Sequence, residues 1–181
     1  MNAQGLPAIV TGGGSGLGAG AARALAKAGA KVAVLDVNKS AADTVAKDVG
    51  GVAFECDVAD AASGKAAVEA ARDVNGPVAI CVNCAGIGTP GRIVGRSGPM
   101  NLEQFARVIN INLIGTFNIM RLAAADMMTR EPNTDGERGL VVNTASVAAY
   151  EGQVGQAAYS ASKGGVVGLT LPAAREFARN G

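Results

Sequence analysis

The chain has 181 residues, a length that suits one domain with a single sizeable core. Hydrophobic residues make up 49% of it and charged residues 17%, which excludes a disordered chain. The formal net charge is +1, without the basic excess that is typical of nucleic-acid binding. The chain contains no histidine, so Ser-His-Asp hydrolysis, Cys-His proteolysis and histidine-based metal sites are excluded.

Short apolar runs alternate with helical patterns along the whole chain, which predicts an α/β fold with a Rossmann-type, doubly wound parallel sheet. The predicted strands are 6–10, 31–35, 52–56, 78–83 and 140–143. The predicted helices are 17–28, 40–49, 61–73, 101–129 and 156–178. Two long loops, 86–100 and 130–139, lie between these elements, and long loops of this kind concentrate ligand contacts.

The end of the sequence leaves this predicted sheet short of a strand. The last helix follows the fifth strand as a crossover connection would, but Gly181 comes before any sixth strand. A further β-α-β unit needs roughly 30 more residues. Without it, the apolar strand 140–143 would lie at an exposed edge. We therefore expect residues 1–181 to form a single domain that lacks its C-terminal strands.

The cysteines of the chain do not form the pattern of a metal site or of a disulfide framework. The three cysteines, Cys56, Cys81 and Cys84, imply no disulfide framework. Cys81 and Cys84 form a C-x-x-C, but the period-2 alternation of a strand places them on opposite faces, so we expect no metal site.

No uninterrupted apolar run approaches the roughly 20 residues of a membrane span, and Met1–Pro7 lacks the basic start of a secretory signal. We expect a cytoplasmic protein without a membrane partner, and an organelle matrix is the alternative location.

A glycine-rich turn, Thr11-Gly-Gly-Gly-Ser-Gly-Leu-Gly18, joins the first predicted strand to the first helix. Glycines let the backbone turn tightly beside a pyrophosphate, and the free amides of the helix N-terminus favour the anion. Gly12, Gly16 and Gly18 have the T-G-x-x-x-G-x-G spacing, which predicts a dinucleotide site. No Lys-Ser/Thr pair follows, which argues against a phosphate-loop ATPase. A glycine turn without a ligand is the alternative.

The nucleotide is expected to be NAD because of Asp36, which ends the second strand 18 residues beyond Gly18. A carboxylate there hydrogen-bonds a ribose 2′-hydroxyl and repels the 2′-phosphate of NADP. The nearby Lys39 weakens this preference, and a helix N-terminal cap is the alternative role for Asp36. Other residues follow the third and fourth strands at the same edge of the sheet and are expected to approach the adenosine: Asp57, Val58, Asn83, Cys84, Ala85 and Gly86. The alternative is that either segment only ends its strand.

Tyr159 and Lys163 are four residues apart and therefore share one face of the last predicted helix. A free tyrosine has a pKa of about 10, and a neighbouring cation favours its phenolate form. The pair thus predicts that Tyr159 takes the proton of an alcohol whose carbon gives hydride to nicotinamide, while Lys163 also holds a ribose hydroxyl. Ser146 would bind the substrate oxygen and Asn112 would support a water chain to Lys163. By spacing alone, Tyr159 and Lys163 are equally a surface i,i+4 pair. Their position after the fifth strand of a nucleotide-binding sheet favours an active site.

Taken together, these motifs resemble the short-chain dehydrogenase/reductase family, in the family's order and over essentially the whole chain. The residues that carry the resemblance are Thr11–Gly18, Asp57-Val58, Asn83–Gly86, Asn112, Ser146 and Tyr159–Lys163. The resemblance implies an oxidoreductase that transfers hydride between NAD and a secondary alcohol or ketone. It implies that the catalytic residues are Asn112, Ser146, Tyr159 and Lys163, with Ser146 and Tyr159 also binding substrate. Cys84 departs from the pattern, since many members carry a second asparagine there.

Within the family, the stretch Asn143–Gly165 is similar to the 3-hydroxyacyl-CoA dehydrogenases. This implies oxidation of (S)-3-hydroxyacyl-CoA to 3-oxoacyl-CoA with NAD, in fatty-acid or branched-chain amino-acid breakdown. It also implies a homotetramer with helices 101–129 and 156–178 between subunits, although their small residues are equally suited to pack on the sheet. The NAD contacts that it carries over are Ser15, Leu17, Asp36, Asp57, Val58 and Cys84.

The sequence alone leaves three questions about substrate and function open. Arg92 and Arg96 would meet the phosphates of CoA, or are simply solvated. The same catalytic residues would serve a 3-oxoacyl-carrier-protein reductase or another ketone reductase. A different class of function is a non-catalytic module that binds NAD or only oligomerises.

Overall fold

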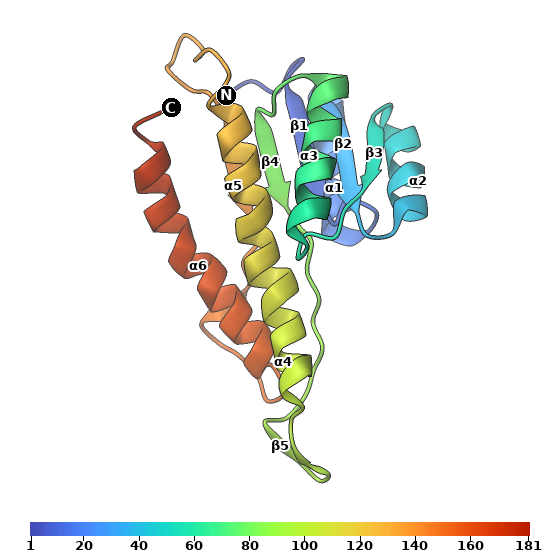
Figure 1. Ribbon diagram of the computed structural model, residues 1–181, viewed down its shortest axis with the longest axis vertical. Coiled ribbons are helices and arrows are strands. Elements are labelled where there is room, and N and C mark those ends of the chain that lie inside the picture. The colour runs from blue at the N-terminus through green and yellow to red at the C-terminus, as the bar shows by residue number, and fades with distance from the viewer.

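The computed structural model describes residues 1–181 and is organised around a sheet of five parallel strands (Figure 1). These strands are β1 (Pro7–Thr11), β2 (Lys31–Asp36), β3 (Val52–Glu55), β4 (Ile80–Asn83) and β7 (Leu140–Asn143). Their order is β3-β2-β1-β4-β7, so the chain builds outward from β1 to one edge and then crosses to β4. Ligands of such sheets bind at the carboxyl ends of the strands, where the order reverses. Here that point lies between β1 and β4.

Helices cover both faces of the sheet because its central strands are apolar on both sides. The helices α1 (Gly16–Lys27) and α2 (Lys39–Val49) bury one face, around Val10 and Val34. The helices α3 (Ala61–Asn75) and α5 (Gly115–Met127) bury the other, around Ile9 and Leu35. Neighbouring residues of one strand thus enter opposite cores, as the two-residue period of a strand requires. The predicted fold class is confirmed.

The long predicted helix consists of α4 (Leu102–Ile109), a π-helical turn at Asn110–Ile114 and α5, which run on without a break. By length and composition, Leu102–Met127 would be able to cross a membrane, but half of its most apolar window is buried inside this protein. Core helices of soluble proteins meet the same criterion. The last helix, α6 (Ala157–Phe177), lies beside α4 and the π-turn (Figure 1).

Besides the π-turn, a short hairpin and a 3-10 turn were not predicted. Within the loop after β4, the strands β5 (Val94–Gly95) and β6 (Gly98–Pro99) form a hairpin that projects beyond α4 (Figure 1). A 3-10 turn, Val147–Ala149, follows β7. By contrast, the predicted exposed edge is confirmed, because β7 is the last strand of the sheet and Leu140 and Val142 are 47% and 43% exposed.

Candidate active site

The glycine turn between β1 and α1 is a backbone cradle that side chains would fill. Gly12 has a φ of 61°, and a Cβ there would lie 2.8 Å from the backbone nitrogen of Ala85. A Cβ on Gly18 would overlap the carbonyl group of Gly12. Ser15 precedes α1 without capping it through its side chain, so the amides of the first helical turn face outward without a side-chain partner. The turn is therefore shaped for an anion beside its backbone.

Asp36 is attached to this turn. Its two carboxylate oxygens accept hydrogen bonds from the backbone amides of Gly14 and Asn38, each at 2.9 Å. Asn38 is the N-cap of α2, because its side chain accepts from the amide of Ala41, so the alternative role of Asp36 as that cap is wrong. The ammonium of Lys39 is paired with Asp43, which leaves Asp36 as the charged group at the end of β2.

Thr11 fixes the loop that follows β4, a role that the sequence analysis did not assign. Its hydroxyl is buried and accepts hydrogen bonds from the amides of Cys84 and Ala85, both at 3.2 Å. Asn83, which was predicted to approach the adenosine, is instead buried and donates to Asn143 across β4 and β7 at 2.9 Å. The loop after β4 therefore reaches the site through Cys84–Gly86, while Asn83 joins two strand ends.

The loop after β3 is held by Asn118 of α5. The side-chain amide of Asn118 donates to the carbonyl oxygens of Val58 and Asp60, at 2.9 and 3.3 Å. Asp57 is exposed beside it, and its carboxylate accepts from the amide of Ala59. Asp57 and Val58 consequently form a fixed wall next to the glycine turn and Asp36.

Tyr159 and Lys163 lie on α6, one turn apart. Lys163 is buried with 5% of its surface exposed, and its Nζ donates to the carbonyl oxygen of Thr144 at 2.6 Å. The same nitrogen is 5.8 Å from the centre of the Tyr159 ring. Burial lowers the pKa of Lys163 below its usual value of 10.5, and the nearby Cys84 opposes that shift. The pair is thus not a solvated surface pair.

Asn112 lies in the π-turn and is completely buried. Its Nδ2 donates to the carbonyl oxygen of Ile87 at 2.9 Å and to the hydroxyl of Ser162 at 3.0 Å. Its Oδ1 accepts from the amide of Ile87 at 2.8 Å. Both hydrogens of this amide are used within the protein, so the side chain clamps the loop after β4 instead of binding a water chain through Nδ2.

Ser146 follows β7 and caps the 3-10 turn, where its Oγ accepts from the amide of Ala148 at 3.2 Å. A hydroxyl has one proton and two lone pairs, so this bond leaves the proton of Ser146 available to another acceptor. Arg92 and Arg96 are exposed around the β5–β6 hairpin. This placement favours the reading of these two side chains as solvated.

One large cavity, of about 1270 Å³, lies along the carboxyl ends of the strands. The predicted residues that line it are Gly12, Ser15, Gly16, Leu17, Gly18, Asp36, Asp57, Val58, Cys84, Ala85, Gly86, Tyr159 and Lys163. Asn83, Asn112 and Ser146 do not line it. Thr144 and Gln156 do, although the sequence analysis assigned neither of them. The position of Thr144 directly after the fifth strand was the signal available for it.

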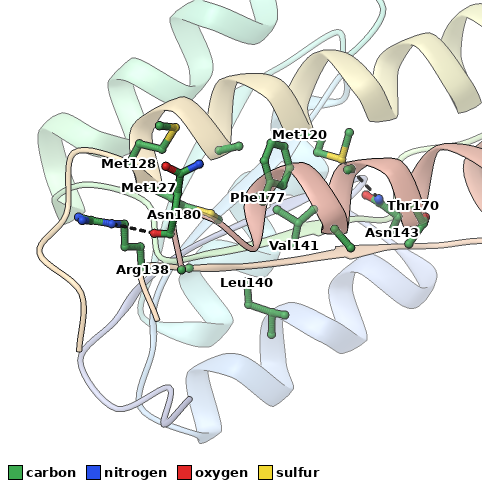
Figure 2. A pocket seen from close by; sticks show the side chains of 15 residues that line it. Met120, Met127, Met128, Arg138, Leu140, Val141, Asn143, Thr170, Phe177 and Asn180 are labelled. Carbon is green, nitrogen blue, oxygen red and sulfur yellow. Dashed lines mark hydrogen bonds between the residues drawn. The ribbon is translucent and has the colours of Figure 1, made fainter. Parts of the chain in front are cut away.

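A second cavity, of about 230 Å³, lies between α5, α6 and β7 and contains none of the predicted residues. Figure 2 shows Phe177 and Val141 facing this space, with Met120 and Met127 from α5, while Leu140 points to the other side of the sheet. Its lining is mostly apolar and it holds no cluster of acid, base or nucleophile. The large cavity is therefore the candidate active site.

The sequence matches the family model described as short chain dehydrogenase over residues 7–181. The chain belongs to the short-chain dehydrogenase family. The resemblance predicted from the motifs is confirmed.

Relatives within the short-chain dehydrogenase family carry names that specify a substrate. The 3-hydroxyacyl-CoA dehydrogenase type-2 of Bos taurus is 50% identical over 184 residues, which cover 99% of this chain and 70% of that protein. The crystal structure of 3-hydroxyacyl-CoA dehydrogenase type-2 from Mycobacterium avium has a TM-score of 0.90 at 40% identity, covering 98% of this chain and 71% of the other. The (3R)-3-hydroxyacyl-CoA dehydrogenase of Homo sapiens is 35% identical over 187 residues, 96% of this chain and 68% of that protein.

Proposed function

We propose that the protein is an NAD-dependent dehydrogenase that oxidises (S)-3-hydroxyacyl-CoA to 3-oxoacyl-CoA. The observation that carries this proposal is that one cavity is bordered at once by the glycine turn, Asp36 and the Tyr159–Lys163 pair. A dinucleotide site and a proton-transfer group are thus within one space. The names of the bovine and mycobacterial relatives support the substrate class.

The cavity fits an NAD molecule because each part of that molecule meets suitable groups. The glycine turn, which a Cβ at Gly18 would fill, suits the pyrophosphate. The carboxylate of Asp36 suits the adenosine ribose and repels a 2′-phosphate. Asp57 and Val58 would hold the adenine, and Lys163 would hold the ribose at the nicotinamide end. Bound NAD would supply the hydride acceptor.

The protein groups at the other end of the cavity suit the transfer of a proton. The phenolate form of Tyr159 would accept the proton of the substrate hydroxyl and become the neutral phenol. The buried ammonium of Lys163, fixed by the carbonyl oxygen of Thr144, would stabilise negative charge on the phenol oxygen. Ser146 lies outside the lining of the cavity, two residues beyond Thr144, and its unused hydroxyl hydrogen would be donated to the oxygen of a bound substrate. Together these groups would hold and move one proton at the hydroxyl oxygen of the substrate.

The test is NADH formation from (S)-3-hydroxybutyryl-CoA, with Tyr159→Phe as the decisive variant. Tyr150 is the only other tyrosine and is 77% exposed outside the cavity, so Tyr150→Phe removes the same hydroxyl as a matched control. We expect Tyr159→Phe to lower kcat by about 10²–10⁴-fold and Tyr150→Phe to leave it unchanged. NAD binding without turnover in the wild type would instead support a non-catalytic module.

Two comparisons define the substrate and the cofactor. The human (3R)-relative makes the (R)-thioester the informative competitor, and we expect the (S)-enantiomer to be oxidised with the higher kcat/KM. We also expect NAD to exceed NADP in kcat/KM, with Asp36→Asn reducing the difference, because the repulsion of the 2′-phosphate disappears with the carboxylate. A wild-type preference for NADPH with 3-oxoacyl-carrier-protein would support the reductase alternative.

We further propose that the protein assembles as a homotetramer through α4, α5 and α6. These helices expose large apolar side chains, including Leu102 (78%), Phe117 (52%) and Leu171 (55%), which contact with other subunits would bury. Phe117→Glu should yield smaller species in light scattering. Val74 of α3 is 59% exposed, and Val74→Glu is the matched control that should leave the mass unchanged. A monomeric wild type would contradict the proposal.

A further inference from the structure

Ser162 is completely buried on α6, between Tyr159 and Lys163, and none of the roles above uses it. Its Oγ donates to the carbonyl oxygen of Tyr159 at 2.7 Å. The same Oγ accepts from Nδ2 of Asn112 at 3.0 Å. A serine hydroxyl has a single proton, so with that proton committed to Tyr159 the oxygen faces Asn112 only as an acceptor.

This restriction fixes which way the Asn112 amide points. Its Nδ2 must face the Ser162 oxygen, which leaves the second Nδ2 hydrogen for the carbonyl of Ile87 and Oδ1 for the amide of Ile87. Rotating the amide by half a turn would set Oδ1 against the carbonyl oxygen of Ile87 and leave buried groups without partners. A buried polar group without a hydrogen-bond partner destabilises the folded state. Ser162 thus helps to keep both hydrogen bonds on Ile87.

The loop that Asn112 holds borders both Tyr159 and Lys163. A Cβ placed on Gly88 would lie 3.8 Å from Cδ2 of the Tyr159 ring. A Cβ placed on Gly86 would lie 3.8 Å from Nζ of Lys163. A path of hydrogen bonds thus runs from Tyr159 through Ser162 and Asn112 to the loop, and at Gly88 the loop faces the Tyr159 ring with room for about one methyl group.

We propose that Ser162 is a positioning residue for proton transfer: its hydroxyl orients the Asn112 amide, which holds the loop at Ile87–Gly88 against the Tyr159 ring. This inference rests on the proposed function, because it concerns the placement of the same phenol. Misplacing a reacting group by about 1 Å costs on the order of 10²-fold in rate. Loss of the hydroxyl should therefore act on kcat more than on cofactor binding.

The experiment compares Ser162→Ala with Ser160→Ala. Ser160 lies on the same turn of α6, and its buried Oγ has no hydrogen-bond partner, so the control deletes the same atom without breaking a bond. We expect Ser162→Ala to lower kcat for (S)-3-hydroxybutyryl-CoA at least about 10-fold with little change in the Kd for NAD. We expect Ser160→Ala to match the wild type in both.

Two further measurements identify the route of the effect. In a double-mutant cycle, Ser162→Ala should cost little more in kcat once Asn112 is alanine, because the hydroxyl acts through that amide. Hydrogen exchange of the Ile87 amide should be faster in Ser162→Ala than in Ser160→Ala, without substrate or NAD. This exchange readout separates the inference from the proposed activity, since an inactive wild type leaves it measurable.

The inference is overturned if Ser162→Ala keeps the kcat and the Ile87 exchange rate of the Ser160→Ala control. It is also overturned if the losses in kcat from Ser162→Ala and Asn112→Ala simply multiply, since independent sites behave in that way. Should the alanine variant not fold, Ser162→Cys takes its place. Its S–H is a weaker donor and acceptor, and the same outcomes decide.

Discussion

The contact between Gly18 and the glycine turn leads to the sharpest prediction about cofactor binding. A Cβ at position 18 would lie 2.6 Å from the carbonyl carbon of Gly12 and 3.0 Å from Cα of Gly13, where ordinary contact begins at 3.4 Å. Gly18→Ala must therefore displace the turn by roughly 1 Å, which deforms the backbone cradle proposed for the pyrophosphate. A displacement of that size is expected to weaken NAD binding on the order of 10²-fold, or about 2.8 kcal/mol. Overpacking should also lower stability by about 1–3 kcal/mol.

The assay is titration of NAD by calorimetry, together with thermal unfolding. Gly20 provides the matched control, because it is exposed on the same helix and a Cβ there would meet nothing within 4 Å. Gly20→Ala should bind NAD normally and gain about 0.5–1 kcal/mol of stability, the usual effect of replacing glycine inside a helix. Equal weakening of NAD binding by both variants, or unchanged binding by Gly18→Ala, would refute the reasoning.

Three other results are expected. Lys163→Met should abolish turnover yet raise the Tm at neutral pH, because a buried cation is removed. Between the lowered pKa of Lys163 in the folded protein and 10.5, the unfolded wild-type chain binds one more proton than the folded one, so the stability of the wild type rises with pH. The difference in Tm between the variant and the wild type should therefore shrink in that pH range. A Tm below the wild type would contradict this. Iodoacetamide should label Cys84 first, since burial raises the pKa of Cys56 and Cys81 to about 12. NAD should slow that labelling, because Cys84 lines the large cavity. Peptide mass spectrometry detects both effects. Asn118→Ala should raise the KM for NAD about 10-fold with kcat unchanged, because the loop after β3 loses two hydrogen bonds; an unchanged KM would show that the loop holds its place without them.

Much of the fold was predictable because the strands of a doubly wound sheet are buried on both faces. Runs such as Val32–Leu35 are continuously apolar, and glycine or asparagine marks where the following helices begin. The π-turn was not predictable, since Asn110–Ile114 has the same apolar spacing as the α-helices on either side of it. What distinguishes it is the pair of hydrogen bonds between Asn112 and Ile87, 25 residues earlier in the chain.

The site separates in the same way into local and distant parts. The glycine turn and the Tyr159–Lys163 pair depend on spacing within a few residues, so the sequence predicts their placement at one cavity. The roles of Thr11 and Ser162 depend on partners 73 and 50 residues away. A single hydroxyl carries no local sign of such a partner, because serine and threonine occur equally in solvated positions. These two side chains were therefore within the quoted motifs but without an assigned function.

Asn83 shows how a residue predicted as a ligand contact serves the site from behind it. In register, Asn83 of β4 is the partner of Asn143 of β7, and their side chains are joined by a hydrogen bond at the last position of both strands. The segment Cys84–Gly86 leaves the first strand at this point, and Thr144, whose carbonyl oxygen holds Lys163, leaves the second. The spacing of the two cavity walls thus depends on a partly buried amide pair at the base of both. Because neither amide lines the large cavity, their effect on the reaction passes through Lys163 and the loop after β4, and this loop is also the one that Asn112 holds from the π-turn.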